Sequence, residues 1–289
     1  MITIFTPTFN RANLLSDLYE SLCRQTCFDF EWIIVDDGSV DNTREVVEKF
    51  YITDKFSIRY FHKENEGKHI AYNFAVEKAK GEWFFIVDSD DLLPENSIEI
   101  ILKYCGEIND KDSFVGVGGN IVHRDGTQIG NKSEYSTLDL TPAQFRRKYF
   151  GDKAEIIRTE VARKYRFPQF EGEKFMQESF LWLSISNDGY LIRWFNESIY
   201  IRDYLEGGLT NTGKSSAQKS PLSRSFADNH IVSSKDIRFI DRVKSSINYY
   251  RYGKLGGLSY KYLFTKSNSK LLSLISIVIA CLCPIDTKK

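Results

Sequence analysis

The sequence lacks the features that mark several common classes of protein. Its 39 basic residues equal its 39 acidic residues, so no net charge favours nucleic acid as a partner. Its five cysteines include no Cys-x-x-Cys pair, and no histidine lies near them at zinc-site spacing. The first residues lack the charged and apolar regions of a signal peptide. We therefore expect a cytoplasmic protein that does not bind nucleic acid.

The sequence also lacks an apolar run long enough to cross a membrane. Residues 271–285 form a run of about fifteen, whereas a spanning helix needs roughly twenty. The basic flank of Lys261, Lys266 and Lys270 favours a segment that rests on an anionic inner membrane leaflet. A core helix that docks on the rest of the protein is the alternative, and the sequence leaves both open.

The first part of the chain alternates strand and helix patterns. Four apolar runs indicate strands, and each is followed by residues at helical spacing. The runs lie at residues 2–6, 31–37, 57–62 and 82–88, and the later helices begin near Asn42, Lys68 and Pro94. Because the runs are almost continuously apolar, we expect an α/β fold whose largely parallel sheet is buried on both faces.

After Ser113 the pattern becomes mixed. Asp125-Gly126 is typical of a hairpin turn. We expect helices over residues 141–165 and 180–185, strands over 190–195 and 198–204, and a polar loop over 205–218.

Acidic residues follow the fourth predicted strand, in the sequence DSDD (88–91). Asp88 and Asp90, separated by one residue at a strand end, can both reach one Mg²⁺ or Mn²⁺ ion, which would neutralise a diphosphate. Open α/β sheets bind ligands beyond the carboxyl ends of their strands. Asp91 could instead cap the helix that begins near Pro94.

Two further clusters follow strands. In VDDGSVDNT (35–43), Asp36 and Asp37 could accept hydrogen bonds from a base or ribose, whereas Asp41 and Asn42 favour a loop with a helix cap. In NEGKHIAYN (65–73), a glycine at a helix start allows close approach of the backbone, and the next lysine offers a charge to a phosphate.

Together these segments resemble a known family, the family 2 glycosyltransferases of the GT-A fold. The resemblance rests on four motifs in order and covers roughly the first 120 residues: TPTFNR (6–11), VDDGSVD (35–41), NEGKHIAYN (65–73) and IVDSDD (86–91). It implies a GT-A domain over residues 1–210, with a Rossmann-like nucleotide-sugar part (1–115) and an acceptor part of mixed β structure (116–210). Residues 211–289 then form a helical, basic C-terminal region.

The resemblance also implies site residues for a nucleotide-sugar donor. Those that hold the base and ribose would be Thr6, Thr8, Asn10, Arg11, Asp36 and Asp37. Those that flank the base and phosphates would be Gly67, Lys68 and Asn73. Asp88 would contact the ribose and the metal, and Asp90 would bind the metal, Mn²⁺ or Mg²⁺.

The segment PQFEGEKFMQES (168–179) resembles the acceptor side of the family. The commoner form there is Glu-Asp or Asp-Asp, whereas this chain has Gln177-Glu178. We expect Glu178 to deprotonate the acceptor hydroxyl, with Glu173 as the second candidate. In the segment that follows, Arg202 is expected to contact a phosphate, and Gly207-Gly208 to hinge a lid over the donor.

The resemblance therefore implies an inverting glycosyltransferase that uses a nucleotide sugar, UDP-linked by preference. Its acceptor would be a saccharide or a lipid-linked molecule in the assembly of a bacterial surface polysaccharide. Three alternatives are a phospho-receiver signalling module, a nucleotidyltransferase and a non-catalytic binder of sugar nucleotides. The first would need a lysine at a later strand end, which FVGVGGNIV (114–122) does not supply, and the second a glycine-rich basic loop, which TPTFNR is not.

Overall fold

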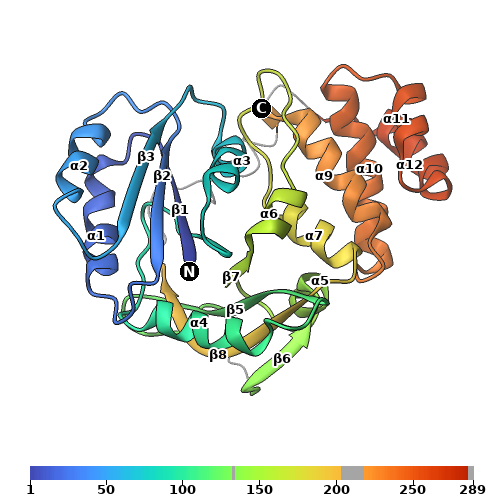
Figure 1. Ribbon diagram of the computed structural model, residues 1–289. Helices are drawn as coiled ribbons and strands as arrows, with labels where there is room; N and C mark the ends of the chain where they lie inside the picture. The colour runs from blue at the N-terminus through green and yellow to red at the C-terminus, as the bar shows by residue number, and fades with distance from the viewer. Residues whose placement is uncertain (132–133, 203–217, 286–289) are drawn as a thin grey trace. The chain divides into compact units, whose positions relative to one another are not determined.

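The chain folds into two compact units (Figure 1). The computed structural model describes residues 1–131, 134–202 and 218–285. One unit comprises Met1–Arg166 and Gly189–Tyr204, and the other comprises Phe167–Asp188 and Leu205–Lys289. The predicted divisions at residues 115 and 210 stay predictions.

An eight-stranded sheet lies at the centre of the first unit, in the order β3-β2-β1-β4-β7-β5-β8-β6. Strands β1 to β4 pair in parallel, as predicted, whereas β7 and β6 run antiparallel to their neighbours. The strands are β1 (Ile2–Thr8), β2 (Phe30–Asp36), β3 (Ser57–His62), β4 (Trp83–Ile86), β5 (Phe114–Val122), β6 (Thr137–Leu140), β7 (Lys153–Arg158) and β8 (Leu191–Ile201). This mixed sheet confirms the predicted α/β class.

Helices cover both faces of the sheet, as nearly continuous apolar strands require. They are α1 (Ala12–Cys23), α2 (Thr43–Phe50), α3 (Lys68–Lys78), α4 (Ser97–Glu107), α5 (Pro142–Lys148) and α6 (Thr159–Lys164). Apolar residues of α1, α2 and α4 share one core cluster with Trp32 and Phe85 of the sheet. On the opposite face, Tyr72 of α3 contacts the rings of Phe5 and Phe84.

The glycines of β5 make room for a large side chain on the neighbouring strand. A Cβ atom at Gly118 would lie 2.6 Å from the indole of Trp194, which is fully buried. Real Cβ atoms essentially never approach another heavy atom so closely. The strand therefore carries glycine where the sheet must accept Trp194.

Two predictions for the second half of the sheet are wrong. The expected helix over residues 141–165 is interrupted by β7, which is inserted between β4 and β5. The two strands expected at 190–195 and 198–204 form one strand, β8, whose register against β5 shifts several times. The predicted turn at Asp125-Gly126 is confirmed, because Gly126 has φ +84° and its N–H bonds to the carbonyl of His123.

One edge of the sheet gathers the carboxyl ends of β1, β2, β3, β4, β5 and β8. This follows from the pairing, since β7 is antiparallel to both β4 and β5, and β8 is parallel to β5. A bridge between Leu92 and Ile201 joins the segment after β4 to the end of β8. Residues distant in sequence thus meet beside the DSDD segment.

The elements of secondary structure in the described part of the second unit are helices, which follow the irregular segment 167–178. They are α7 (Ser179–Asn187), α9 (Pro221–Ser233), α10 (Phe239–Leu255), α11 (Tyr260–Lys266) and α12 (Lys270–Leu282). Helix α9 packs against α10 and α7, and α12 packs against α10. None of the helices in the described residues has the length and apolar content that a membrane span requires.

Candidate active site

Three aspartates lie together where β4 ends. Carboxylate oxygens of Asp88, Asp90 and Asp91 all lie within 4.8 Å of one another. The backbone N–H of Asp91 bonds to the carbonyl of Asp88, which closes a tight turn. Carboxylates this close repel one another unless cations lie nearby.

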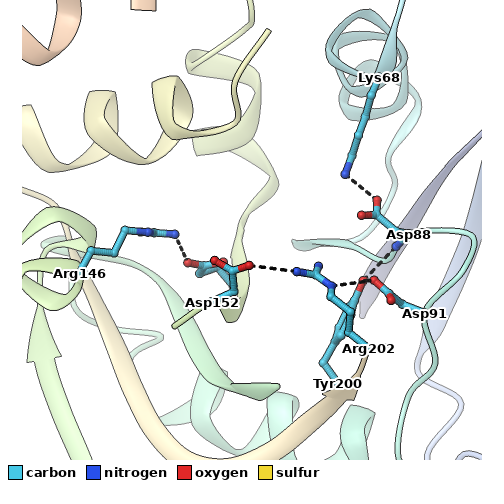
Figure 2. A network of polar contacts seen from close by, with 8 residues as sticks. Lys68, Asp88, Asp91, Arg146, Asp152, Tyr200 and Arg202 are labelled. Atoms are coloured by element: carbon cyan, nitrogen blue, oxygen red, sulfur yellow. Dashed lines mark hydrogen bonds and ion pairs between the residues drawn. The ribbon is translucent and has the colours of Figure 1, made fainter. Parts of the chain in front are cut away.

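Each of these carboxylates contacts a basic side chain from a different part of the chain. The pairs are Lys68 Nζ with Asp88 Oδ1 (2.6 Å), Arg11 with Asp90 Oδ2 (2.9 Å) and Arg202 Nε with Asp91 Oδ2 (3.2 Å). Figure 2 shows the contacts of Lys68 and Arg202. The structure therefore brings together the predicted site residues Arg11, Lys68, Asp88 and Asp90, with Arg202 beside them.

The surroundings act in opposite directions on two of the carboxyl groups. Burial opposes ionisation of Asp88, but Lys68 and then Arg202 hold its pKa below the ordinary value. Burial raises the pKa of Asp91 to about 6, and the negative charge of Asp88 adds to the effect. Asp88 is therefore a stable anion, whereas Asp91 is the group that most readily takes up a proton.

The alternative in which Asp91 caps a helix is wrong. Helix α4 begins at Ser97, and its N-cap residue is Asn96. Asp91 is buried and accepts a hydrogen bond of 2.6 Å from the hydroxyl of Tyr200, which in turn accepts one from the N–H of Asp88 (Figure 2). Tyr200 thus ties the carboxyl end of β8 to the DSDD segment.

The pair that follows β2 is buried and well supplied with donors. Asp36 accepts hydrogen bonds from the N–H of Ser39 (2.7 Å) and the hydroxyl of Tyr60 (2.6 Å). The other member, Asp37, holds the segment before α3. It accepts from Lys63 Nζ (2.9 Å) and from the N–H groups of Glu66 (3.0 Å) and Gly67 (2.7 Å).

The loop after β1 is tied to the loop after β2. Asn10 has φ +52°, a left-handed conformation that asparagine adopts more readily than most residues. Its N–H donates to Ser39 Oγ, and its side chain accepts from the N–H of Val40. Asp41 accepts from the N–H of Ala12 at the start of α1 and from Thr43 at the start of α2. Asp41 thus holds the starts of α1 and α2, whereas the N-cap residue of α2 is Asn42, whose side chain makes no capping hydrogen bond.

The two threonines of the first motif have different surroundings. The hydroxyl of Thr6 is fully buried and accepts a hydrogen bond of 2.9 Å from the indole of Trp32. The hydroxyl of Thr8, also buried, has no hydrogen-bond partner among the described residues. An unmatched buried hydroxyl at the edge where ligands bind is consistent with contact to a ligand.

Helix α3 begins at the remaining predicted donor residues. Gly67 precedes it with φ +98°, a conformation that favours glycine, and Lys68 is its first residue. Asn73 is half-buried on the same helix. Burial lowers the pKa of the neighbouring His69 to about 4, so this imidazole is neutral at pH 7.

The two candidate bases belong to the second unit. Glu178 is exposed and lies at the first turn of α7, where its carbonyl accepts from the N–H of Leu181. Glu173 is buried, and its two carboxylate oxygens accept from the N–H groups of Leu222 and Ser223 at the start of α9, each at 2.7 Å. Glu173 therefore provides hydrogen-bond acceptors for N–H groups at the start of α9, which have no partner within the helix.

Some features of the site had no local signal in the sequence. Tyr200 contacts Asp91 across 109 positions, and Tyr60 contacts Asp36 across 24. Arg202 was expected near a phosphate, and the structure places it beside Asp91. The predicted hinge at Gly207-Gly208 lies outside the described residues.

Comparison with known proteins identifies related sequences. A family model described as "Glycosyl transferase family 2" matches residues 3–171. Glycosyltransferase GlyG of Streptococcus pneumoniae serotype 4 is 37% identical over 119 residues, 41% of this chain and 38% of the relative. Hyaluronan synthase of Pasteurella multocida is 30% identical over 92% of this chain and 26% of the relative. The chain thus matches well under half the length of these two relatives.

Solved structures share the fold at low sequence identity. S. aureus TarS 1-349 in complex with UDP-GlcNAc matches with TM-score 0.66 and 19% identity, over 96% of this chain and 79% of that one. The mannosyltransferase PcManGT from Pyrobaculum calidifontis, in complex with GDP-Man and Mn2+, matches with TM-score 0.53 and 17% identity, over 97% and 79%. These matches confirm the GT-A-like architecture.

Proposed function

The chain belongs to glycosyl transferase family 2 and is a glycosyltransferase, and we propose that it moves a sugar from a nucleoside diphosphate to an acceptor hydroxyl with inversion. UDP is the proposed nucleotide, and the acceptor is a saccharide or a lipid-linked molecule in bacterial surface polysaccharide synthesis. The names of two relatives, the hyaluronan synthase and a putative teichuronic acid biosynthesis glycosyltransferase of Bacillus subtilis, support this setting. We place the reaction in the cytoplasm.

The observation that carries the proposal is the group of ion pairs after β4. The three carboxylates form an all-oxygen set, which fits a hard divalent cation such as Mn²⁺ or Mg²⁺. We propose that Asp88 and Asp90 hold it, where it would act as a Lewis acid on the diphosphate leaving group. The Mn2+ named with PcManGT supports this proposal.

The basic partners of these carboxylates complete the proposed donor site. Arg11, Lys68 and Arg202 each reach a carboxylate through a long side chain. A diphosphate would offer these cations anionic oxygens in place of the carboxylates, which frees Asp88 and Asp90 to ligate metal. The diphosphate and the metal ion should therefore each strengthen the binding of the other.

The nucleoside would lie against the loops after β1 and β2. We propose that Thr6, Thr8, Asn10, Asp36 and Asp37 hold the base and ribose, with Gly67 and Asn73 at the start of α3. The unmatched hydroxyl of Thr8 supports this placement. The backbone contacts of Asp37 give it a second role, because they fix the segment from which α3 begins.

Glu178 is the proposed base that removes the proton of the acceptor hydroxyl, on the face of the sugar opposite the diphosphate. Its exposure supports this choice over Glu173, whose two oxygens already accept backbone hydrogen bonds. A carboxylate that must take up a proton is hindered when both of its oxygens are engaged in this way.

Calorimetric titration of the purified chain with UDP, GDP and dTDP, each with and without Mn²⁺, tests the donor site. Tight binding of one nucleotide that requires the metal is expected. Absence of binding by all three would contradict the proposal and favour the signalling alternative.

A variant separates catalysis from donor binding. Glu178→Ala should leave nucleotide affinity unchanged and lower the release of UDP from the bound nucleotide sugar by roughly 10²- to 10⁴-fold, the usual contribution of a general base. Glu171→Ala, an exposed glutamate of the same segment, is the matched control. Normal turnover by Glu178→Ala would contradict its assignment as the base. Absence of sugar transfer by the unchanged chain as well would favour a non-catalytic binder.

A further inference from the structure

Helix α12 buries three small side chains together with Leu272, and it exposes five of its large apolar side chains. Ser273, Ser276 and Ala280 are no more than 1% exposed, and α12 packs against α10. The outward residues are 57% to 77% exposed: Leu271, Leu274, Ile275, Val278 and Leu282. A helix on a surface that faces only water shows the reverse order, because burial of leucine or isoleucine is much more favourable than burial of serine.

The outward residues form one continuous stripe. Their positions follow the spacing i, i+3, i+4, i+7 and i+11, which places them on a single face of the helix. Contiguous apolar surface of this kind marks a site of interaction with a partner or a membrane. These five residues are the α12 stripe.

The sequence from α10 to α12 is rich in basic residues. Residues 242–285 contain seven Lys or Arg and no Asp or Glu, although basic and acidic residues are equal in number over the whole chain. Three of these basic residues bond to carbonyls at helix ends: Arg242 to Val232 of α9, Arg251 to Cys283 after α12, and Lys270 to the end of α11. Lys254, Lys261 and Lys266 are exposed. A partner of this region must accept both apolar and cationic contacts.

We propose that the α12 stripe, with the exposed lysines of α10 and α11, docks on the surface of an anionic lipid bilayer. A helix of 13 residues is about 20 Å long, so it would lie in the interface rather than cross the membrane. Acyl chains would cover the stripe, and anionic headgroups would pair with Lys254, Lys261 and Lys266. The absence of acidic residues over 242–285 favours lipid over a second copy of this positively charged surface.

Sedimentation of the full chain with lipid vesicles tests this proposal. Vesicles of phosphatidylcholine with phosphatidylglycerol should bind the chain, vesicles of phosphatidylcholine alone should bind it at least about tenfold less, and added salt should weaken the binding. Equal binding to both compositions, or none to either, would overturn the proposal.

Two pairs of variants identify the surface. Leu274→Gln with Ile275→Gln should reduce binding to anionic vesicles by about 100-fold, because two apolar side chains no longer enter the interface. Tyr51→Gln with Ile52→Gln, a matched pair of exposed apolar residues in the first unit, should bind as the unchanged chain does. Lys261→Gln with Lys266→Gln should lower binding to anionic vesicles and leave the weaker binding to phosphatidylcholine vesicles unchanged.

Nucleotide affinity and oligomeric state are measured on the same proteins. Unchanged metal-dependent UDP binding by the α12 variants would show that the effect belongs to the membrane surface and not to the donor site, so the two proposals can fail separately. Light scattering that reveals a dimer, broken by the Leu274 and Ile275 changes and without vesicle binding, would mean that a second copy covers the stripe and would overturn the lipid assignment.

Discussion

Two groups of aspartates occupy equivalent places in the sheet, after β2 and after β4, but their partners differ in kind. Asp36 and Asp37 are held mostly by backbone N–H groups, which are fixed by the fold. The three aspartates after β4 are paired with lysine and arginine side chains, which can turn from one anion to another. The first group therefore stabilises the edge of the sheet, whereas the second can exchange its partners for a ligand.

The largest expected effect tests the structural role of Asp37. Asp37→Ala should lower the free energy of unfolding by about 3–5 kcal/mol, because it leaves the N–H groups of Glu66 and Gly67 without their acceptor and removes one of the two carboxylates that pair with Lys63. Denaturant unfolding measures the change, and Asp54→Ala, at an exposed loop position, should change it by less than about 0.5 kcal/mol. A mild effect at Asp37 would remove the distinction between the two groups.

For the aspartates after β4, we expect a large effect on ligand binding and a small effect on stability. Asp90→Ala should weaken metal-dependent nucleotide binding by at least about 100-fold, because it removes one of the two proposed ligands and outer-shell residues alone contribute up to that much. Its unfolding free energy should change little, since the Arg11 pair that it removes is partly exposed to solvent. Calorimetry measures the nucleotide binding of this variant, and denaturant unfolding measures its stability. Severe destabilisation would mean that Asp90 has a structural role and would contradict the proposal that it exchanges Arg11 for a ligand.

A pH titration sharpens the description of the β2 side of the site, where α3 begins. His69 has a folded pKa of about 4, lowered by burial, against about 6.5 when unfolded. Its neutral form contributes stability that is present above pH 6.5 and is lost as the pH falls towards 4. The difference in unfolding free energy between the unchanged chain and His69→Gln should fall by about 2 kcal/mol between pH 7 and pH 5.

That difference must be taken between the two proteins, because Asp91 acts in the other direction. Its pKa is raised to about 6, so its uptake of a proton stabilises the folded chain as the pH falls. Asp91 is common to both proteins, and its contribution therefore cancels. A difference that stays constant from pH 7 to pH 5 would contradict the assigned pKa of His69.

The smallest expected effect tests whether the carboxylates after β4 can exchange a basic side chain for a metal ion. Lys68→Met should strengthen Mn²⁺ binding in the absence of nucleotide by about tenfold, since the ion no longer competes with the ammonium for Asp88. The same variant should bind UDP more weakly in the presence of Mn²⁺. Lys63→Met serves as the control, because Lys63 pairs with Asp37 and Glu66 and not with the aspartates after β4. Weaker metal binding by Lys68→Met would contradict the exchange.

The parallel half of the sheet could be predicted from the sequence because each of its strands is followed by a helix of its own. Burial of Leu15, Leu18 and Leu22 on α1 matches their helical spacing. Strand β7 could not be predicted, since KAEIIR is a short segment between two helices and becomes a strand only through pairing with β4 and β5.

The candidate site was predicted to a similar extent. Local motifs predicted Lys68, Asp88 and Asp90, which the structure brings together with Arg11. The link from Tyr200 to Asp91 depends on the register of β8, which no local pattern specifies. For the apolar run at 271–285, the structure adds what the sequence left open, because it shows which face of α12 packs on α10 and which does not.

The cross-linked loops after β1 and β2 bear on the thermodynamics of recognition. Asn10, Asp41 and their partners hold these two loops to each other before any ligand arrives. A nucleoside that enters between such loops meets a surface whose conformational entropy has already been lost in folding. Its binding should therefore carry little ordering penalty, and selectivity among bases should arise from shape and hydrogen bonding rather than from closure of these loops.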